Sequence, residues 1–229
     1  MSWIPDFVES FEPKLHTAIL KSFLGMALAP VPCKYEGHRA MLLYMSVLGL
    51  SVLDQEEVLD QFRPEIIAYI TSSELKSDVE CSIGESPFLK TRLADAGSHG
   101  LVTTYLQLAT LSHLKIEPLP STVLLERTLG QIELDCLDLR SLYCYCALKT
   151  HFVIEFKSQE IAKIDQIVDN LRNYEGAFGL APAGEAHAAA TFLSVACLKM
   201  IGVSIQPLEV MRLVSWVDSR QEDMGFSVD

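Results

Sequence analysis

Two basic side chains, Arg140 and His187, stand where long apolar segments begin. Arg140 opens RSLYCYCAL (140–148), and His187 follows a glycine-punctuated stretch, YEGAFGLAPAGEA, and precedes AAATFLSVACLKMIG (188–202). If both segments are helices, these side chains lie in first helical turns, where free backbone N–H groups and the positive end of the dipole favour anions. The pattern therefore predicts an anion site built from helix starts.

Aromatic side chains hold equivalent places in three apolar segments: Tyr105, Tyr143 and Phe192. They recur roughly every 40–50 residues, which is a spacing typical of a helical repeat. Apolar helices that carry aromatic side chains can line an apolar cavity below the anion site. The ligand that such a site fits has an anionic head and a long hydrocarbon tail, and Arg140, His187, Tyr143 and Tyr105 are its candidate binding residues.

Each candidate also has a purely structural explanation. His187 can be a polar residue at a helix start with no further role, and Arg140 can bridge two helices by pairing with a carboxylate. Tyr105 and Tyr143 can be core aromatics with no other role. From the residues alone, these alternatives stay open beside the binding role.

The elements that must position these residues are nearly all helices. Apolar residues recur at helical spacing, and strand-like alternation is absent. The expected helices are 15–28, 39–53, 58–70, 99–114, 138–152, 161–172, 187–201 and 208–217. Three segments are apolar on every side (101–114, 140–148 and 188–202), whereas 159–172 and 207–220 carry charges on one face. This alternation predicts an all-α fold with an inner layer wrapped by an outer layer, and the stretch from Ser72 to Ala96 is expected to be a loop.

Composition limits the class of protein. The chain has 229 residues, of which 49% are hydrophobic, and a net charge of −12. The acidic charge argues against nucleic acid as a partner and suits a basic partner or peptide. No apolar run is long enough to predict a membrane span, and the first residues do not resemble a signal peptide.

Cysteine usage predicts free thiols in a reducing, cytoplasmic setting. The six cysteines form no CxxC pair, and most of them lie in apolar stretches: Cys33, Cys81, Cys136, Cys144, Cys146 and Cys197. Cys144 and Cys146 are two residues apart, so they point to different faces of a helix and are poor joint metal ligands. Cys197 is expected to serve packing. The sequence itself therefore predicts no metal site.

Several motifs resemble the β subunits of the protein prenyltransferases, which attach farnesyl or geranylgeranyl groups to cysteines. The similar pieces are DLRSLYC (138–144), YEGAFGLAPAGEAHAAATF (174–192) and LVSWVDSRQEDMGF (213–226). Upstream, HRAMLLYMSVLGLSVLD (38–54) and ADAGSHGLVTTYLQLATL (94–111) resemble the type I geranylgeranyltransferase in particular. The resemblance runs in order along most of the chain.

The resemblance implies an α–α toroid, here a single domain over residues 1–229. In that family the isoprenoid lies in a central funnel with its diphosphate near the rim, and a zinc ion activates the acceptor thiol. Carried over residue by residue, His187 would contact the diphosphate, Arg140 and Tyr143 would line the isoprenoid channel, and Tyr105 would form a further wall. The implied reaction is transfer of geranylgeranyl from its diphosphate to the cysteine of a C-terminal CaaX motif. The implied partners are a prenyltransferase α subunit and CaaX proteins with basic tails.

The chain also departs from the family pattern. Ala188 and Ala189 stand where the family has two glycines, and the turn before Asp138 is shortened. The family's zinc ligands, in an Asp-x-Cys-Tyr motif and a later histidine, have no counterpart in residues 1–229. We therefore expect a toroid that is cut before the zinc-ligand motif, incomplete at its C-terminal end and inactive by itself. The alternatives are a non-catalytic helical scaffold or α-subunit-binding remnant and an unrelated helical-repeat binding module.

Overall fold

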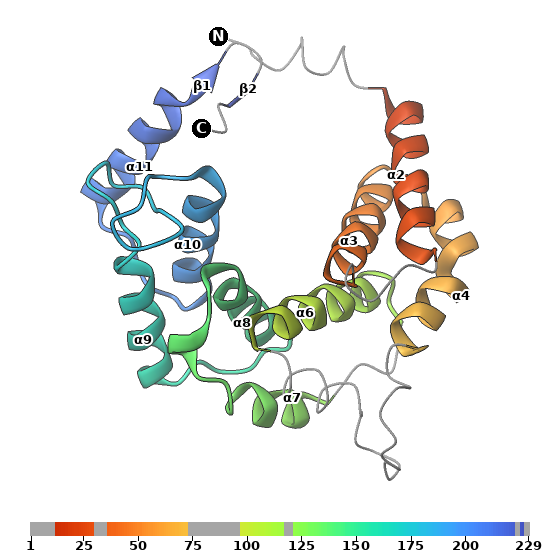
Figure 1. The fold of residues 1–229 in the computed structure, drawn as a ribbon, viewed down its shortest axis with the longest axis horizontal. Helices are drawn as coiled ribbons and strands as arrows, with labels where there is room; N and C mark the ends of the chain where they lie inside the picture. Colours follow the sequence, from red (N-terminus) through yellow and green to blue (C-terminus); the bar gives the residue numbers. More distant parts are fainter. Residues whose placement is uncertain (1–11, 30–35, 73–96, 117–120, 223–224, 227–229) are drawn as a thin grey trace. The chain divides into compact units, whose positions relative to one another are not determined.

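The computed structural model describes residues 12–29, 36–72, 97–116, 121–222 and 225–226 (Figure 1). These residues form helices joined by turns and loops, with one short hairpin in which β1 (Gln221–Glu222) pairs antiparallel with β2 (Gly225–Phe226). The all-α prediction is therefore confirmed. Residues 73–96, which were predicted to form a loop, lie outside the described residues.

All eight predicted helices are present, and each begins and ends within three residues of its predicted bounds. They are α2 (Pro13–Leu28), α3 (Glu36–Val52), α4 (Glu56–Ser72), α6 (Gly97–His113), α8 (Leu139–His151), α9 (Ser158–Asp169), α10 (Ala188–Met200) and α11 (Pro207–Ser219). A further helix, α7 (Thr122–Leu129), and a 3₁₀ turn, η2 (Leu134–Cys136), were not predicted. With 8 residues, α7 is too short to show a clear apolar period, and its start is fixed by the Ser121 side chain, which accepts from the N–H of Leu124.

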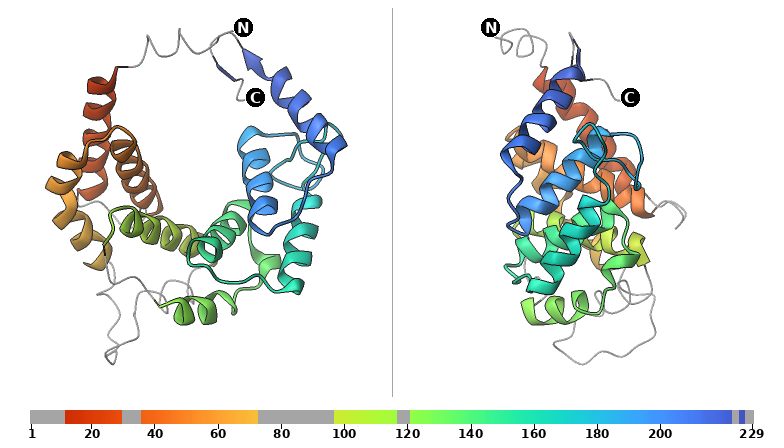
Figure 2. Two further views of the ribbon diagram at one scale, coloured as in Figure 1. Left: turned by 180° about the vertical axis from the view of Figure 1, so that it is seen from behind. Right: turned by 90° about the vertical axis from the view of Figure 1, so that its left-hand side faces the viewer.

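The chain divides into two compact units. The first comprises Met1–Arg92 and Thr103–Pro120, and the second comprises Leu93–Val102 and Ser121–Asp229, so that α6 contributes to both. The prediction of one domain over residues 1–229 stays a prediction. In the first unit α2 packs against α3 and α4, and α3 also packs against α4 (Figure 2). Arg39 donates from Nε to the carbonyl of Ala27 and so closes the C-terminal end of α2.

The second unit has two layers of helices. Figure 1 and Figure 2 show α8 and α10 in one layer and α9 and α11 in the other. The rings of Tyr143 and Phe192 lie 6.2 Å apart near the starts of α8 and α10, and further along both helices Cys197 lies near enough to Cys146 to raise its pKa. Because both contacts follow the same order, α8 and α10 run in the same direction. The two helices therefore form a parallel pair in this unit.

The prediction that helices apolar on every side are buried on every side holds for α8 and is wrong for α10. Nine residues of α8 are buried, including Leu142 and Cys144, which point to different faces. In α10, by contrast, Phe192 is 63% exposed, and Ala188 and Ala189 are exposed. One face of α10 packs on α8 and α9, whereas the face that carries Phe192 stays open.

Four helices end in the same backbone motif. The second residue past each helix end has a left-handed conformation: Asp54 after α3, Lys115 after α6, Val153 after α8 and Gly202 after α10, with φ between 53° and 77°. After α8, the N–H of Ile154 reaches back to the carbonyl of Lys149 at 2.8 Å, and the other three ends share this bond. This is the Schellman arrangement, which satisfies free carbonyls at a helix end. By contrast, neither of the two residues that follow α9, Asn170 and Leu171, is left-handed, so α9 does not end in this motif.

We expect Val153→Gly to raise the melting temperature by a few degrees. A β-branched residue at φ 55° costs about 1–2 kcal/mol, whereas glycine takes this conformation without strain. Val153 is 89% exposed, so its side chain contributes little packing that could be lost. Gly202→Val is the matched control, because no atom lies within 4 Å of the added Cβ and only the conformation changes. It should lower the melting temperature, and equal effects of the two changes would contradict the argument.

Candidate functional site

A tightly bonded loop between α9 and α10 positions His187. The Asn173 side chain accepts from the N–H groups of Glu175 and Ala177 and holds the first turn of this loop. Gly176 follows at φ 88°, and the N–H of Gly179 returns to the carbonyl of Leu171 at 2.9 Å. The loop is therefore fixed by its own backbone.

Phe178 anchors this loop in the core. Its side chain is fully buried, and the guanidinium of Arg172 lies 5.0 Å from the centre of its ring. The Thr191 side chain contacts both its N–H and its carbonyl, at 3.2 and 3.4 Å. The same carbonyl accepts from the N–H of His187 at 3.0 Å. Phe178 therefore ties the loop to the first turn of α10 and places His187 at the helix start, as predicted.

His187 is the N-cap of α10. Its Nδ1 accepts from the N–H of Ala189 at 3.2 Å, which places the proton of the neutral ring on Nε2. The ring is half-buried. Nε2–H remains available to donate to a ligand at the helix start, so the structural and binding explanations of His187 are compatible.

The start of α8 carries opposite charges on Asp138 and Arg140. The Asp138 carboxylate caps the helix by accepting from the N–H of Ser141 at 2.8 Å. Arg140 is exposed, two residues further on. Tyr143 is half-buried one turn below it, against Phe192.

The second unit brings three of the four predicted residues to the same end of one helical layer. Since α8 and α10 run parallel and touch at Tyr143 and Phe192, their N-terminal turns are neighbours. Arg140 and His187 therefore stand at adjacent helix starts, above a partly exposed aromatic pair. Each start also offers backbone N–H groups and the positive end of its dipole.

Tyr105, the fourth predicted residue, lies in the first unit. It is half-buried on α6, with its ring 6.3 Å from that of Tyr44 on α3. Its predicted role as a channel wall stays a prediction.

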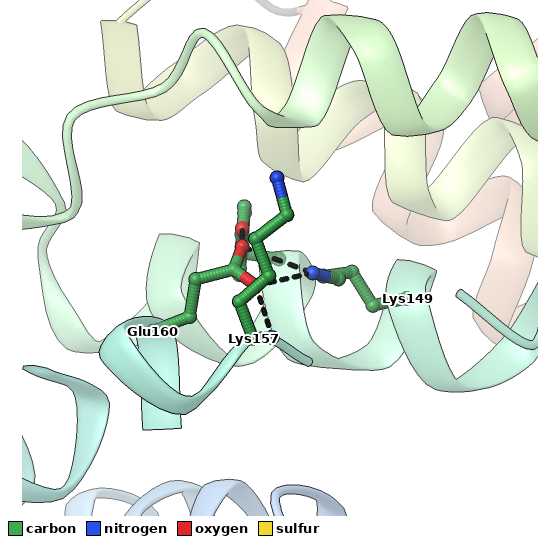
Figure 3. Close-up of polar contacts among 4 residues, drawn as sticks. Lys149, Lys157 and Glu160 are labelled. Atoms are coloured by element: carbon green, nitrogen blue, oxygen red, sulfur yellow. Dashed lines mark hydrogen bonds and ion pairs between the residues drawn. The ribbon is translucent and has the colours of Figure 1, made fainter. Parts of the chain in front are cut away.

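A buried ionic network ties α8 to α9 and was not predicted (Figure 3). Nζ of Lys149 lies 2.9 and 2.8 Å from the two carboxylate oxygens of Glu160, and the Tyr145 hydroxyl donates to the same carboxylate. Figure 3 shows Lys149 reaching toward Glu160, whose carboxylate also accepts from the backbone N–H of Lys157 at 2.6 Å. The sequence held a signal for this network, because a lysine on a helix buried all round needs a partner.

The network changes the pKa of two of its members. Burial acts to raise the pKa of Glu160, but the hydrogen bonds from Lys149, Tyr145 and the Lys157 N–H lower it below its ordinary value. Burial and the bond to Glu160 raise the pKa of Tyr145. The carboxylate is therefore held ionised in a structural role, since no predicted site residue belongs to the network.

The described ranges contain no group of three or more His, Cys, Asp or Glu side chains arranged to hold a metal ion. Burial, with Asp138 nearby, raises the pKa of Cys144 to about 12, and the contact with Cys197 together with burial raises the pKa of Cys146. Cys144 and Cys146 are two residues apart on α8, so their side chains point to different faces and are poor joint ligands of one ion. These residues do not fit a zinc ion.

A cavity of about 430 Å³ lies elsewhere in the second unit, between α9 and the start of α11. Its charged lining includes Asp165, Asp169, Glu209 and Arg172. Arg172 already pairs with Asp169 and Glu209, at 3.1 and 3.3 Å. None of the predicted site residues lines this cavity, so it is separate from the candidate site.

Comparison with protein families gives one match that covers most of the chain. The model described as "Prenyltransferase alpha-alpha toroid domain" matches residues 11–227. No solved structure matches the chain. No helix in the part of the chain that the structure describes has the length and apolar character required to cross a bilayer.

Two curated proteins are similar to shorter parts of the chain. This chain is 32% identical over 92 residues to "Protein farnesyltransferase subunit beta" of Pisum sativum. The aligned segment covers 39% of this chain and 21% of that relative. It is also 26% identical over 98 residues to "Geranylgeranyl transferase type-1 subunit beta" of Arabidopsis thaliana. That aligned segment covers 38% of this chain and 26% of that relative. The chain thus matches about a quarter or less of the length of each.

Proposed function

Since the chain belongs to the prenyltransferase alpha-alpha toroid domain family, we propose that it is a β-type chain of a protein prenyltransferase that binds an isoprenoid diphosphate. The proposed reaction of the whole enzyme is transfer of geranylgeranyl to the cysteine of a CaaX motif, in complex with an α subunit. Similarity to two proteins named as β subunits supports this proposal. The acidic net charge of −12 suits protein substrates with basic tails.

The adjacent starts of α8 and α10 carry the proposal. His187 would donate from Nε2–H to the diphosphate, and the exposed guanidinium of Arg140 would supply positive charge beside it. Below them, Tyr143 and Phe192 offer an apolar wall on which a polyprenyl chain can pack. The exposed methyl groups of Ala188 and Ala189 narrow the space at the start of α10, where the family has glycines.

The described residues offer no zinc site, so no step that activates an acceptor thiol is assigned to them. The same observation favours a second candidate function, a non-catalytic scaffold that keeps the isoprenoid site or an α-subunit surface. The two functions share the binding site and differ in group transfer.

We expect His187→Ala to weaken geranylgeranyl diphosphate binding by about 10-fold or more, and Arg140→Ala to have a similar effect. One hydrogen bond to a charged group is worth about 1.5–3 kcal/mol, and each factor of ten in affinity is about 1.4 kcal/mol. Lys199→Ala is the matched control, because Lys199 is an exposed cation at the opposite end of α10. Calorimetric titration of the full chain measures each affinity.

Geranylgeraniol, which lacks the diphosphate, separates head-group binding from tail binding. It should bind the wild-type chain and the His187→Ala variant equally. A transfer assay with a CaaX peptide, an α subunit and zinc then distinguishes the two functions: transfer supports the enzyme, and binding without transfer supports the scaffold. Unchanged diphosphate affinity in both the Arg140 and His187 variants would refute the site.

A further inference from the structure

Arg172 joins three segments of the second unit through one side chain. Its Nε lies 3.1 Å from the Asp169 carboxylate at the end of α9, and its Nη1 lies 3.3 Å from the Glu209 carboxylate in the first turn of α11. Its guanidinium also lies over the ring of Phe178, 5.0 Å from the ring centre. One cation therefore links α9 and α11 to the loop that leads to His187.

The backbone reinforces the contact between Arg172 and Phe178. These two residues form an isolated antiparallel bridge, and next to it the N–H of Gly179 donates to the carbonyl of Leu171 at 2.9 Å. Residues that are directly opposite each other in an antiparallel pair point to the same side. The guanidinium is therefore directed over the ring by the backbone pairing as well as by its carboxylate partners.

Phe178 passes this restraint to His187. Its ring is fully buried, and its carbonyl accepts from the N–H of His187 at 3.0 Å. Nη1 of Arg172 is buried and has no hydrogen-bond partner among the described residues, so the charge of Glu209 is what offsets its burial. A shift of Phe178 would separate its ring from a cation that two carboxylates hold in place.

We propose that Arg172 is a positioning residue for the isoprenoid-diphosphate site: by holding Phe178, it fixes His187 where Nε2–H can donate to the diphosphate. The inference rests on the proposed function, in which His187 binds the diphosphate. Arg172 lines the cavity between α9 and α11, and none of the candidate site residues lines that cavity. Arg172 therefore acts through Phe178 and not by contact with the ligand.

Hydrogen exchange of the full chain without ligand tests whether Arg172 holds the histidine. In Arg172→Met, the N–H of His187 should exchange about 10-fold faster, because its bond to Phe178 opens more often without the cation. The N–H of Leu142, which bonds to the Asp138 carbonyl at 2.9 Å at the start of α8, is the internal reference and should change by less than about 2-fold. Equal acceleration at both amides would show that Arg172 only stabilises the fold, and would overturn the proposal.

Titration with geranylgeranyl diphosphate measures the effect on the site. Arg172→Met should lower the affinity by about 5-fold or more, and Arg172→Lys, which keeps the charge, should lower it less. The affinity for geranylgeraniol should stay unchanged in both variants. Arg220→Met is the matched control, because it also removes a guanidinium near an aromatic ring, 5.4 Å from the centre of Trp216, at the end of α11. This control should leave both affinities unchanged.

The two measurements separate this proposal from the function on which it rests. If His187→Ala binds the diphosphate as the wild-type chain does, the proposed isoprenoid site is wrong, and exchange at His187 alone decides whether Arg172 holds the histidine. If His187→Ala weakens binding and Arg172→Met does not, Arg172 is not a positioning residue.

Discussion

Replacing Lys149 with methionine is expected to lower the free energy of unfolding by about 3 kcal/mol, because it leaves the Glu160 carboxylate without its cation. Lys149 is 3% exposed, so little water can take its place beside the carboxylate. The Tyr145 hydroxyl and the Lys157 N–H still donate to Glu160, which keeps the loss below that of a fully unpaired charge. Chemical denaturation followed by circular dichroism measures the change.

A double-mutant cycle isolates the energy of the pair. Glu160→Gln alone should destabilise the protein, and Lys149→Met with Glu160→Gln should cost less than the sum of the single changes by about 1 kcal/mol or more. Lys163→Met is the matched control, because Lys163 is a lysine on α9, the helix that carries Glu160. Its partner Asp135 lies 2.7 Å away, but the two side chains are 37% and 68% exposed, so the expected change is under about 0.5 kcal/mol. Equal losses at Lys149 and Lys163 would refute the role of burial.

The same pair gives stability a defined dependence on pH. The pKa of Glu160 is lower in the folded protein than its ordinary value of 4.5, so the folded state favours the ionised carboxylate. This contribution is complete above the unfolded pKa and is lost as the pH falls through the lower folded pKa. The difference in stability between the wild type and Glu160→Gln should therefore shrink between about pH 5 and pH 3.

The helices could be predicted from the sequence because apolar spacing decides most of them. The segment that became α10 has no charge before Lys199 and ends at Gly202, so both its type and its end were evident. The burial of its faces was not evident, because apolar composition does not show which face packs against another helix. The exposure of Phe192 could therefore not be predicted.

The backbone motif after α8 could not be predicted. Glycine or asparagine usually marks a left-handed residue at a helix end, and Gly202 follows this rule. Val153 breaks it, because β-branched residues disfavour that conformation. Only tertiary context explains why Val153 takes the same place.

The position of His187 could be predicted from the sequence, whereas its hydrogen bonds could not. A histidine before an apolar helix indicates a helix start, and the structure places His187 there as the N-cap. That Nδ1 caps the helix and Nε2 stays available depends on the loop that bends back through Phe178. The partners of Lys149 were missed for a similar reason, since Glu160 lies on a different helix.

Gly179→Ala is expected to destabilise the protein by about 2–3 kcal/mol and to weaken isoprenoid-diphosphate binding. The added Cβ would lie 2.9 Å from the carbonyl oxygen of Glu185 and 3.1 Å from the carbonyl carbon of Gly184, both of which are backbone atoms. Backbone atoms cannot rotate away as the end of a flexible side chain can, so the loop must open. The segment that moves leads directly to His187.

Two measurements separate this local effect from a general loss of stability. The melting temperature should fall by roughly 5–10 °C, and geranylgeranyl diphosphate affinity should fall even at temperatures where the variant is fully folded. Gly25→Ala adds the same methyl group within α2, where no atom lies within 4 Å, and should leave affinity unchanged while raising stability by up to about 1 kcal/mol. A Gly179→Ala variant that loses stability but binds normally would show that the loop supports the fold without positioning His187.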